Sequence, residues 1–262
     1  MWTRKIHFSF YFFDDTMPDR IAQHIRDTKN ANYDFDVQVW SPARARELLL
    51  THYPEFVSRY DEFPYAIQRS DFSRYAILHA YGGVYKDLDY SLNVPLQTIF
   101  AHLDADASLG CCSAFVNETP NNVFSRALSN SFMISRTPKH PFWLAVMSAA
   151  QNGSGISAHQ RIITGTGPAL ITNTYNRYYS RDKSVGVLPK QQFNPCSVCE
   201  RGSTCRGRKG VLACHDSAGS WNGADTKALN VLYCNVGWIS AVFILSAVCI
   251  TFIALYLTKR VG

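Results

Sequence analysis

The chain has 262 residues, 47% of them hydrophobic and 13% aromatic, which suits one sizeable core with an appendage. The formal net charge is +6, from 26 Lys and Arg against 20 Asp and Glu, and no basic run is interleaved with aromatic residues. This pattern excludes a nucleic-acid groove, whereas the modest positive charge fits either an anionic substrate or an ordinary protein surface.

The first third of the chain alternates predicted strands with predicted helices. The strands are expected at 5–13 and 33–40 and the helices at 17–29 and 42–53. Pro42 suits the first turn of its helix, and Ser41 before it suits the N-cap. This alternation indicates an α/β sheet.

A helix, a glycine break and a short strand then lead to two carboxylates. Apolar residues recur at helical spacing in 69–81, which predicts an amphipathic helix with one face packed inward. Gly82 and Gly83 end this helix, where left-handed backbone angles are needed. The strand that follows closes at Asp87 and Asp89, whose side chains point to the same side of an extended chain.

Two carboxylates held side by side repel each other unless a cation lies between them. Oxygen ligands of this kind suit Mg²⁺ or Mn²⁺, above all an ion that also holds substrate phosphates. The D-x-D pattern also occurs at Asp34 and Asp36 and at Asp104 and Asp106. Neither of those pairs follows a helix, a Gly-Gly break and a strand, so both are predicted to be solvated carboxylates.

The stretch from Phe63 to Asp89, which begins F-P-Y-A-I-Q-R-S-D-F-S-R-Y, resembles the DxD-motif sugar-transferase family, a glycosyltransferase family 32-like group. Three more segments resemble the family in matching order: P-K-H-P-F-W at 138–143, T-G-P at 166–168 and H-x-x-x-x-S-W at 215–221. Within the family, the chain is most similar to inositol-phosphoceramide mannosyltransferase catalytic subunits. The resemblance implies a GT-A-type α/β fold, covering residues 1–226.

The resemblance also implies a metal site. Asp89 would be the direct ligand of Mn²⁺ or Mg²⁺, and Asp87 would bind the ribose or a metal-bound water. His215 and Ser220, from the C-terminal segment, would complete the site over the metal and the diphosphate. The alternative for His215 is an ordinary surface histidine.

Donor-binding residues follow from the same resemblance. Asp71 would hold sugar hydroxyls, and Arg74 would reach the sugar and the phosphate as a charged fork. Phe10 would stack on the base, and Ser220 and Trp221 would close over the diphosphate. The alternatives are a surface salt bridge of small energetic value for Asp71 and Arg74, and core packing for Phe10.

The implied activity is metal-dependent retaining transfer of a sugar, with GDP-mannose as the favoured donor and a membrane glycolipid such as inositol phosphoceramide as acceptor. Asp71, Arg74, Asp87 and Asp89 would be the catalytic set, and a regulatory subunit is a further expected partner. A nucleophilic and a front-face mechanism both stay open. The alternatives are an α-1,6-mannosyltransferase or galactosyl/glucosyltransferase acting on glycans, and an inactive membrane-anchored carbohydrate-binding protein.

The C-terminal region predicts a membrane anchor. Residues 228–258 carry no charge, and 236–257 are long enough for a transmembrane helix. Lys259 and Arg260 follow in a short tail, 258–262, and favour a cytoplasmic C-terminus with a lumenal catalytic domain, in keeping with a Golgi membrane enzyme. No N-terminal signal is visible, so a cytosolic domain is the alternative.

The cysteines cluster in a predicted insertion at about 194–214. Of eight in the chain, four follow a C-x2-C-x5-C-x8-C pattern: Cys196, Cys199, Cys205 and Cys214. Two local disulfides are favoured for a lumenal domain, with zinc as the alternative, although the second half lacks the ligand spacing of common zinc modules. The basic segment 190–209 is either a solvated loop or a contact for an acceptor headgroup.

Overall fold

The structure is a computed structural model, and it describes residues 1–9, 17–119, 127–197, 199–200, 207–215 and 223–238 together with Ser240 and Ser246. The chain divides into two compact units, 1–221 and 222–262. Phe10, Ser220 and Trp221 therefore lie outside the described residues.

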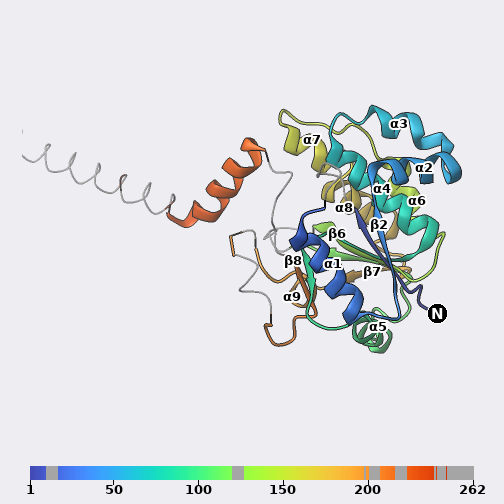
Figure 1. The fold of residues 1–262 in the computed structure, drawn as a ribbon. Helices are drawn as coiled ribbons and strands as arrows, with labels where there is room; N and C mark the ends of the chain where they lie inside the picture. Colours follow the sequence, from blue (N-terminus) through green and yellow to red (C-terminus); the bar gives the residue numbers. More distant parts are fainter. Residues whose placement is uncertain are drawn as a thin grey trace, which may run out of the picture. The chain divides into compact units, whose positions relative to one another are not determined.

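The first unit is an α/β domain (Figure 1). Its strands are β1 (Lys5–Ser9), β2 (Asp36–Trp40), β3 (Gly83–Lys86), β4 (Tyr90–Leu92), β5 (Ala114–Glu118), β6 (Leu128–Ser135), β7 (Val185–Leu188) and β8 (Ala213–His215). Its α-helices are α1 (Asp19–Ala31), α2 (Pro42–His52), α3 (Val57–Glu62), α4 (Ala66–Tyr81), α5 (Leu96–Ala105), α6 (Pro141–Ala149), α7 (Ala158–Gly165), α8 (Pro168–Thr174) and α9 (Lys190–Phe193). Short helical turns of other types occupy Pro54–Phe56 and Tyr175–Tyr179.

Six strands form one mixed sheet in the order β2-β1-β3-β6-β5-β7. β1 is parallel to both β2 and β3, β6 is antiparallel to its neighbours β3 and β5, and β5 is parallel to β7. β4 and β8 form a separate antiparallel ribbon. The predicted α/β class is confirmed, and the ribbon places Tyr90, directly after the D-x-D segment, opposite His215.

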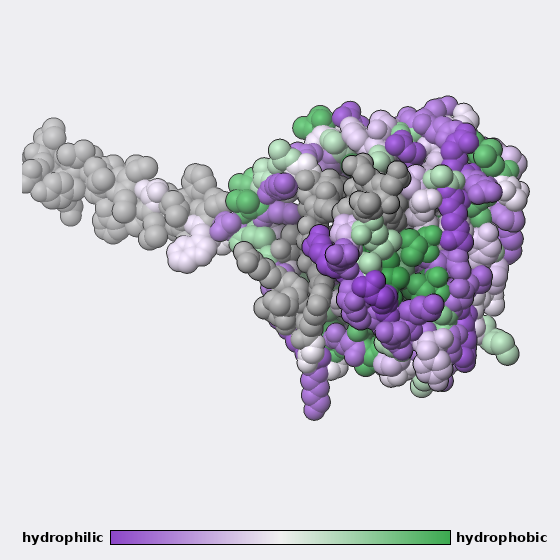
Figure 2. All heavy atoms as spheres, in the orientation of Figure 1, coloured by the Kyte–Doolittle hydropathy of each residue, from purple (hydrophilic) through white to green (hydrophobic). Residues whose placement is uncertain are grey.

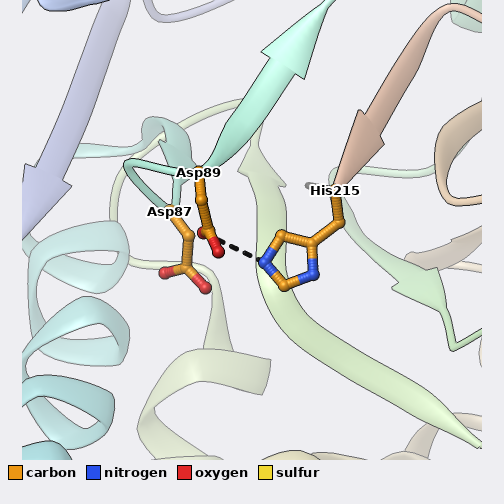
Figure 3. Close-up of side chains that lie close together, drawn as sticks. All are labelled: Asp87, Asp89 and His215. Carbon is orange, nitrogen blue, oxygen red and sulfur yellow. Dashed lines mark hydrogen bonds and ion pairs between the residues drawn. The ribbon is translucent and has the colours of Figure 1, made fainter. Parts of the chain in front are cut away.

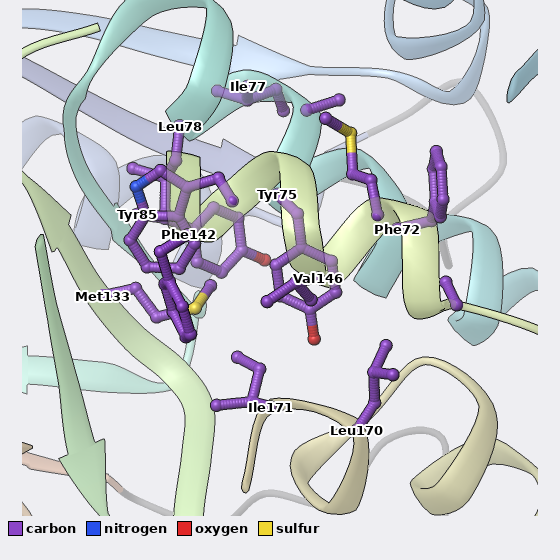
Figure 4. Packing of buried hydrophobic residues seen from close by; sticks show 14 of the residues in the cluster. Phe72, Tyr75, Ile77, Leu78, Tyr85, Met133, Phe142, Val146, Leu170 and Ile171 are labelled. Carbon is purple, nitrogen blue, oxygen red and sulfur yellow. The ribbon is translucent and has the colours of Figure 1, made fainter. Parts of the chain in front are cut away.

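A hydrophobic layer covers each face of the sheet, because neighbouring strand residues point to opposite faces. Tyr85 and Met133 belong to the layer beneath α2, α4, α6 and α8 (Figure 4). Val84 and Phe132, one residue away in each strand, belong to the other layer, which α5 and α9 cover.

Helix α4 is not amphipathic, in contrast to the prediction. Every residue from Ser70 to His79 is buried, because the helix lies between the sheet and helices α2 and α6. Its polar side chains are therefore inside the domain, where each needs a partner.

β5 starts only at Ala114, because the Asp106 carboxylate accepts hydrogen bonds from the backbone N–H groups of Ser108 and Leu109 and holds a turn before it. The predicted opening strand 5–13 is described as far as Ser9.

The glycine break after α4 forms as predicted. Gly82 and Gly83 have φ angles of +65° and +88°. A Cβ atom on Gly83 would lie 2.6 Å from the carbonyl oxygen of Lys5, so the close approach of β3 to β1 requires glycine at this position.

The second unit contains a helix at 224–238. Its exposed apolar residues are Leu229, Val231, Leu232, Tyr233, Val236 and Trp238. Within the described ranges, no helix is both long and apolar enough to cross a membrane. Most of the predicted span 236–257 lies outside those ranges.

The cysteine prediction needs correction. Cys196, Cys199 and Cys234 are disulfide-bonded, whereas Cys214 keeps a buried thiol. Cys196 and Cys199 of the predicted set are thus disulfide-bonded, and so is Cys234, which belongs to the helix at 224–238 and not to that set. Cys214 is instead in β8, beside His215.

Candidate active site

The sequence predicts that Asp87 and Asp89 lie on an extended strand. They lie instead on a tight turn. β3 ends at Lys86, and the backbone N–H of Tyr90 donates to the carbonyl oxygen of Asp87 at 3.0 Å. The N–H of Asp87 donates to the carbonyl oxygen of Ser131 in β6 at 2.8 Å, which ties the turn to the sheet. The turn therefore places both carboxylates at the end of a buried strand while leaving them partly accessible.

His215 reaches these carboxylates through the two-stranded ribbon. It pairs with Tyr90 across β4 and β8, and the two rings stack with centroids 5.6 Å apart. The His215 Nε2 atom lies 3.0 Å from Asp89 Oδ1 (Figure 3). One ligand atom from each of Asp87, Asp89 and His215 lies within 4.8 Å of the others.

This set of donors fits a divalent cation. Two carboxylates and one imidazole suit Mn²⁺, and the carboxylates also suit Mg²⁺. Partial exposure of all three residues leaves positions for substrate oxygens or water. Burial raises the pKa of Asp87, Arg74 opposes that rise, and the charge of Asp89 adds to it, so a cation at this place would stabilise both ionised carboxylates.

Arg74 lies behind the turn, inside the domain. Its guanidinium is 3.0 Å from Asp71 Oδ1 and 3.2 Å from Asp87 Oδ1, and it lies over the Tyr85 ring at 4.7 Å from the centroid. The Tyr85 hydroxyl also donates to Asp87 Oδ1 at 3.0 Å. One cation on α4 thus joins the helix to the turn that bears the D-x-D motif.

Asp71 is buried, and each of its two carboxylate oxygens has a hydrogen-bond partner. Asn130 Nδ2 donates to its Oδ1 at 2.9 Å, and the Thr166 hydroxyl lies 3.2 Å from its Oδ2. Burial is the dominant cause that raises its pKa to about 7, against the opposing charge of Arg74. The alternative of an exposed salt bridge between Asp71 and Arg74 is wrong, because their side chains are only 5% and 4% exposed.

The structure adds Tyr75 and Asn130 to this network, beside Thr166 of the T-G-P segment. Asn130 from β6 also donates to the Tyr75 hydroxyl at 3.0 Å, and that hydroxyl donates to the carbonyl oxygen of Thr166 at 2.6 Å. Tyr75 follows Asp71 by four residues on α4, so helical spacing places it on the same face. Asn130 and Thr166 come from other elements, and no local pattern links them to Asp71.

Five of the eight residues expected at the site therefore lie together: Asp71, Arg74, Asp87, Asp89 and His215. They come from α4, the turn after β3, and β8. The T-G-P segment contributes Thr166, and its proline begins α8.

The segment with the D-x-D turn is also the part of the chain that matches a known family. Residues 18–106 match the family model described as "Glycosyltransferase sugar-binding region containing DXD motif". Over these residues, about a third of the chain, the protein is similar to DXD-containing glycosyltransferases.

Curated relatives are similar over larger or smaller parts of the chain. Inositol phosphoceramide mannosyltransferase 3 of Schizosaccharomyces pombe is 34% identical over 114 residues, which are 44% of this chain and 28% of that protein. An uncharacterized glycosyltransferase of Acanthamoeba polyphaga mimivirus is 24% identical over 190 residues, 70% of this chain and 69% of that protein. Inositol phosphoceramide mannosyltransferase 1 of S. pombe is 23% identical over 220 residues, 82% of this chain and 61% of that protein. The chain thus spans just over a quarter of the first of these relatives.

Two solved structures are similar at lower identity. The PaToxG glycosyltransferase has a TM-score of 0.47 at 16% identity, with 68% of this chain and 70% of that chain covered. A glycosyltransferase involved in the glycosylation of the major capsid of PBCV-1 has a TM-score of 0.44 at 11% identity, with 80% and 92% covered.

Proposed function

We propose that the chain is a metal-dependent glycosyltransferase that uses a nucleotide-diphosphate sugar. The observation that carries this proposal is the juxtaposition of Asp87, Asp89 and His215, with ligand atoms within 4.8 Å, directly in front of the buried Arg74. Sugar transfer has three requirements. The enzyme must bind the donor diphosphate, neutralise the negative charge that develops on it, and orient the acceptor hydroxyl toward the anomeric carbon. The arrangement supplies the first two.

The residues divide this work between them. Asp87, Asp89 and His215 would hold Mn²⁺ or Mg²⁺, which supplies Lewis-acid stabilisation of the leaving diphosphate. Arg74 holds Asp87 in place and adds fixed positive charge behind the site. Asp71, oriented by Asn130 and Thr166, would accept hydrogen bonds from sugar hydroxyls.

The finer assignments are part of the same proposal. Residues 1–226 would form a GT-A-type catalytic domain, and Phe10, Ser220 and Trp221 would complete the donor site. The product would be an α-glycoside formed with retention. GDP-mannose is the favoured donor, because the relatives at 34% and 23% identity are named as inositol phosphoceramide mannosyltransferases.

A donor assay tests the activity. Full-length protein would be incubated with GDP-mannose, GDP-fucose, UDP-glucose and UDP-galactose in Mn²⁺, and release of nucleoside diphosphate would be measured. We expect turnover of GDP-mannose above the others, and its loss in Asp87→Asn. Asp36→Asn, in the exposed D-x-D pair, is the matched control and should keep full turnover. No turnover of any donor by folded wild-type protein would support the carbohydrate-binding alternative.

The acceptor is proposed to be an anionic membrane lipid such as inositol phosphoceramide. A membrane anchor at 236–257 would begin about ten residues after the catalytic domain, and an extended residue spans at most about 3.5 Å, so the site would stay near the bilayer. Transfer from GDP-mannose would be compared between liposomes carrying inositol phosphoceramide and soluble mannan oligomers. Efficient transfer to the oligomers alone would favour an α-1,6-mannosyltransferase.

A further inference from the structure

Lys86 is a buried cation with no part in the site as described so far. It is the last residue of β3, directly before Asp87, and it is fully buried. An ammonium group has three donors and no acceptor, and removing it from water is costly unless those donors are used. The groups that accept hydrogen bonds from Lys86 therefore indicate the structural role of its ammonium group.

Three partners of Lys86 among the described residues lie on or beside the D-x-D turn. The Nζ atom donates to the carbonyl oxygen of Tyr90 and lies 2.8 Å from His24 Nε2 of α1. It also lies over the Phe8 ring of β1, at 4.6 Å from the centroid. Because the ammonium can only donate, the neutral His24 ring accepts through Nε2.

The bond from Lys86 to Tyr90 closes the turn that carries both carboxylates. Lys86 and Tyr90 flank the segment 87–89, and the hydrogen bond from the Tyr90 N–H to the Asp87 carbonyl oxygen lies within the same loop. Tyr90 also starts β4, where it pairs with His215 and stacks against its ring. Fixing Tyr90 therefore fixes the turn and the strand position opposite the third ligand residue.

The two buried cations hold the turn from opposite faces of the sheet. Tyr85 packs in the layer beneath α4, where Arg74 contacts Asp87. Lys86 points to the other face, where Phe8 belongs to the second hydrophobic layer. Arg74 acts on a carboxylate, whereas Lys86 acts on the backbone.

We infer that Lys86 is a positioning residue that presets the geometry of the Asp87–Asp89–His215 cation site by anchoring the turn to α1. This inference rests on the proposed function, since it concerns how that site is preorganised. Supporting residues of this kind change metal affinity by about 10- to 100-fold when removed. A residue that served packing alone would change stability and leave the affinity of the folded protein unaltered.

The test measures Mn²⁺ affinity and local order in the same full-length proteins. Mn²⁺ binding in the presence of GDP would be followed by electron paramagnetic resonance, and amide hydrogen exchange would be read at Tyr90. Lys86→Met should bind Mn²⁺ at least about tenfold more weakly than wild type and exchange the Tyr90 amide faster. Tyr90→Phe is the matched control, because it removes the hydroxyl that donates to Phe193 but keeps the carbonyl that accepts from Lys86.

A second pair of variants covers the case in which Lys86→Met does not fold. His24→Leu removes an acceptor of Lys86, and His24→Gln keeps one, so only the former should weaken Mn²⁺ binding and speed exchange at Tyr90. Affinities of the folded Lys86 and His24 variants within about twofold of wild type would overturn the inference. Absence of Mn²⁺ binding by wild-type protein would instead contradict the proposed function.

Discussion

At the scale of single residues, Asp71 has an unusual acid–base property. Burial raises its pKa to about 7, so the folded protein binds this proton more tightly than the unfolded chain does. Between about pH 4 and pH 7 the folded state holds the extra proton, and stability must fall as the pH rises through that window.

Asp71→Asn removes this titration. The free energy of unfolding of wild type, relative to the variant, should fall by up to about 4 kcal/mol between about pH 4 and pH 8. Denaturant unfolding at several pH values measures the difference. If the two stability curves run parallel across the window, Asp71 does not titrate as inferred.

His7 has the opposite dependence on pH. Trp40 Nε1 donates to its Nδ1 at 3.2 Å, and its Nε2 lies 2.9 Å from the carbonyl oxygen of Gly82, so the ring is neutral with its proton on Nε2. Burial lowers the pKa of His7 to about 4. The unfolded chain therefore binds more protons between about pH 4 and 6.5, and stability is lost as the pH falls through that window.

His7→Gln keeps one donor and one acceptor but cannot titrate. The acid-induced loss of unfolding free energy should shrink by roughly 3 kcal/mol relative to wild type, measured by denaturant unfolding between about pH 4 and pH 7. The exposed His52→Gln is the control and should follow wild type. If His7→Gln loses as much unfolding free energy at low pH as wild type does, groups other than His7 cause that loss.

The residue-level predictions from sequence succeeded where spacing was local. Asp71 and Arg74 are three residues apart on a helix, and Asp87 and Asp89 are two apart, so their proximity follows from elementary geometry. His215 lies 126 residues from Asp89, and only the family resemblance placed it at the site. Asn130 and Thr166 depend on how β6 and α7 pack against α4, which no short pattern encodes.

At the scale of elements, the glycine break after α4 sets how closely β3 approaches β1. Gly83→Ala would combine a φ of +88° with a Cβ atom 2.6 Å from the Lys5 carbonyl oxygen. We expect a loss of stability of about 2 kcal/mol or more by thermal or denaturant unfolding. Gly207→Ala is the control, because Gly207 has a φ of +77° with no atom within 4 Å, and it should cost about 1 kcal/mol. Equal losses would show that the contact with Lys5 adds nothing.

The elements that sequence predicted less well share one cause, which is competition from tertiary packing. The sequence of α4 predicts one apolar face, yet the domain buries every residue from Ser70 to His79, and several of these are polar residues of the site. The D-x-D segment looks extended, yet the Tyr90 to Asp87 backbone bond folds it into a turn. The predicted strands β1 and β2 and the helix α2 do form within their predicted ranges, and Ser41 caps α2 as expected.

At the scale of the whole molecule, the first unit shows an interspersed, largely hydrophilic surface on the face seen in Figure 2, as expected of a domain in water. The charge-free segment 228–258 and the basic residues after it remain the basis for a membrane anchor with a lumenal catalytic domain. Disulfide bonds at Cys196, Cys199 and Cys234 suit an oxidising compartment.

This topology predicts protease protection. In sealed vesicles from expressing cells, the catalytic domain should resist added protease and become sensitive once detergent opens the membrane. A protein of known cytosolic exposure on the same vesicles serves as the control. Digestion of the domain without detergent would place it on the cytosolic side.

The central claim is that the D-x-D turn and His215 form one divalent cation site. Its most direct test is a Mn²⁺ titration by electron paramagnetic resonance in the presence of GDP, on wild type, Asp89→Asn, His215→Ala and Asp36→Asn. Wild type and Asp36→Asn should each bind one Mn²⁺, and the other two variants should lose at least about tenfold in affinity. A cooperative transition in denaturant would show that these two variants are still folded. Undiminished Mn²⁺ binding by Asp89→Asn and His215→Ala would contradict the claim.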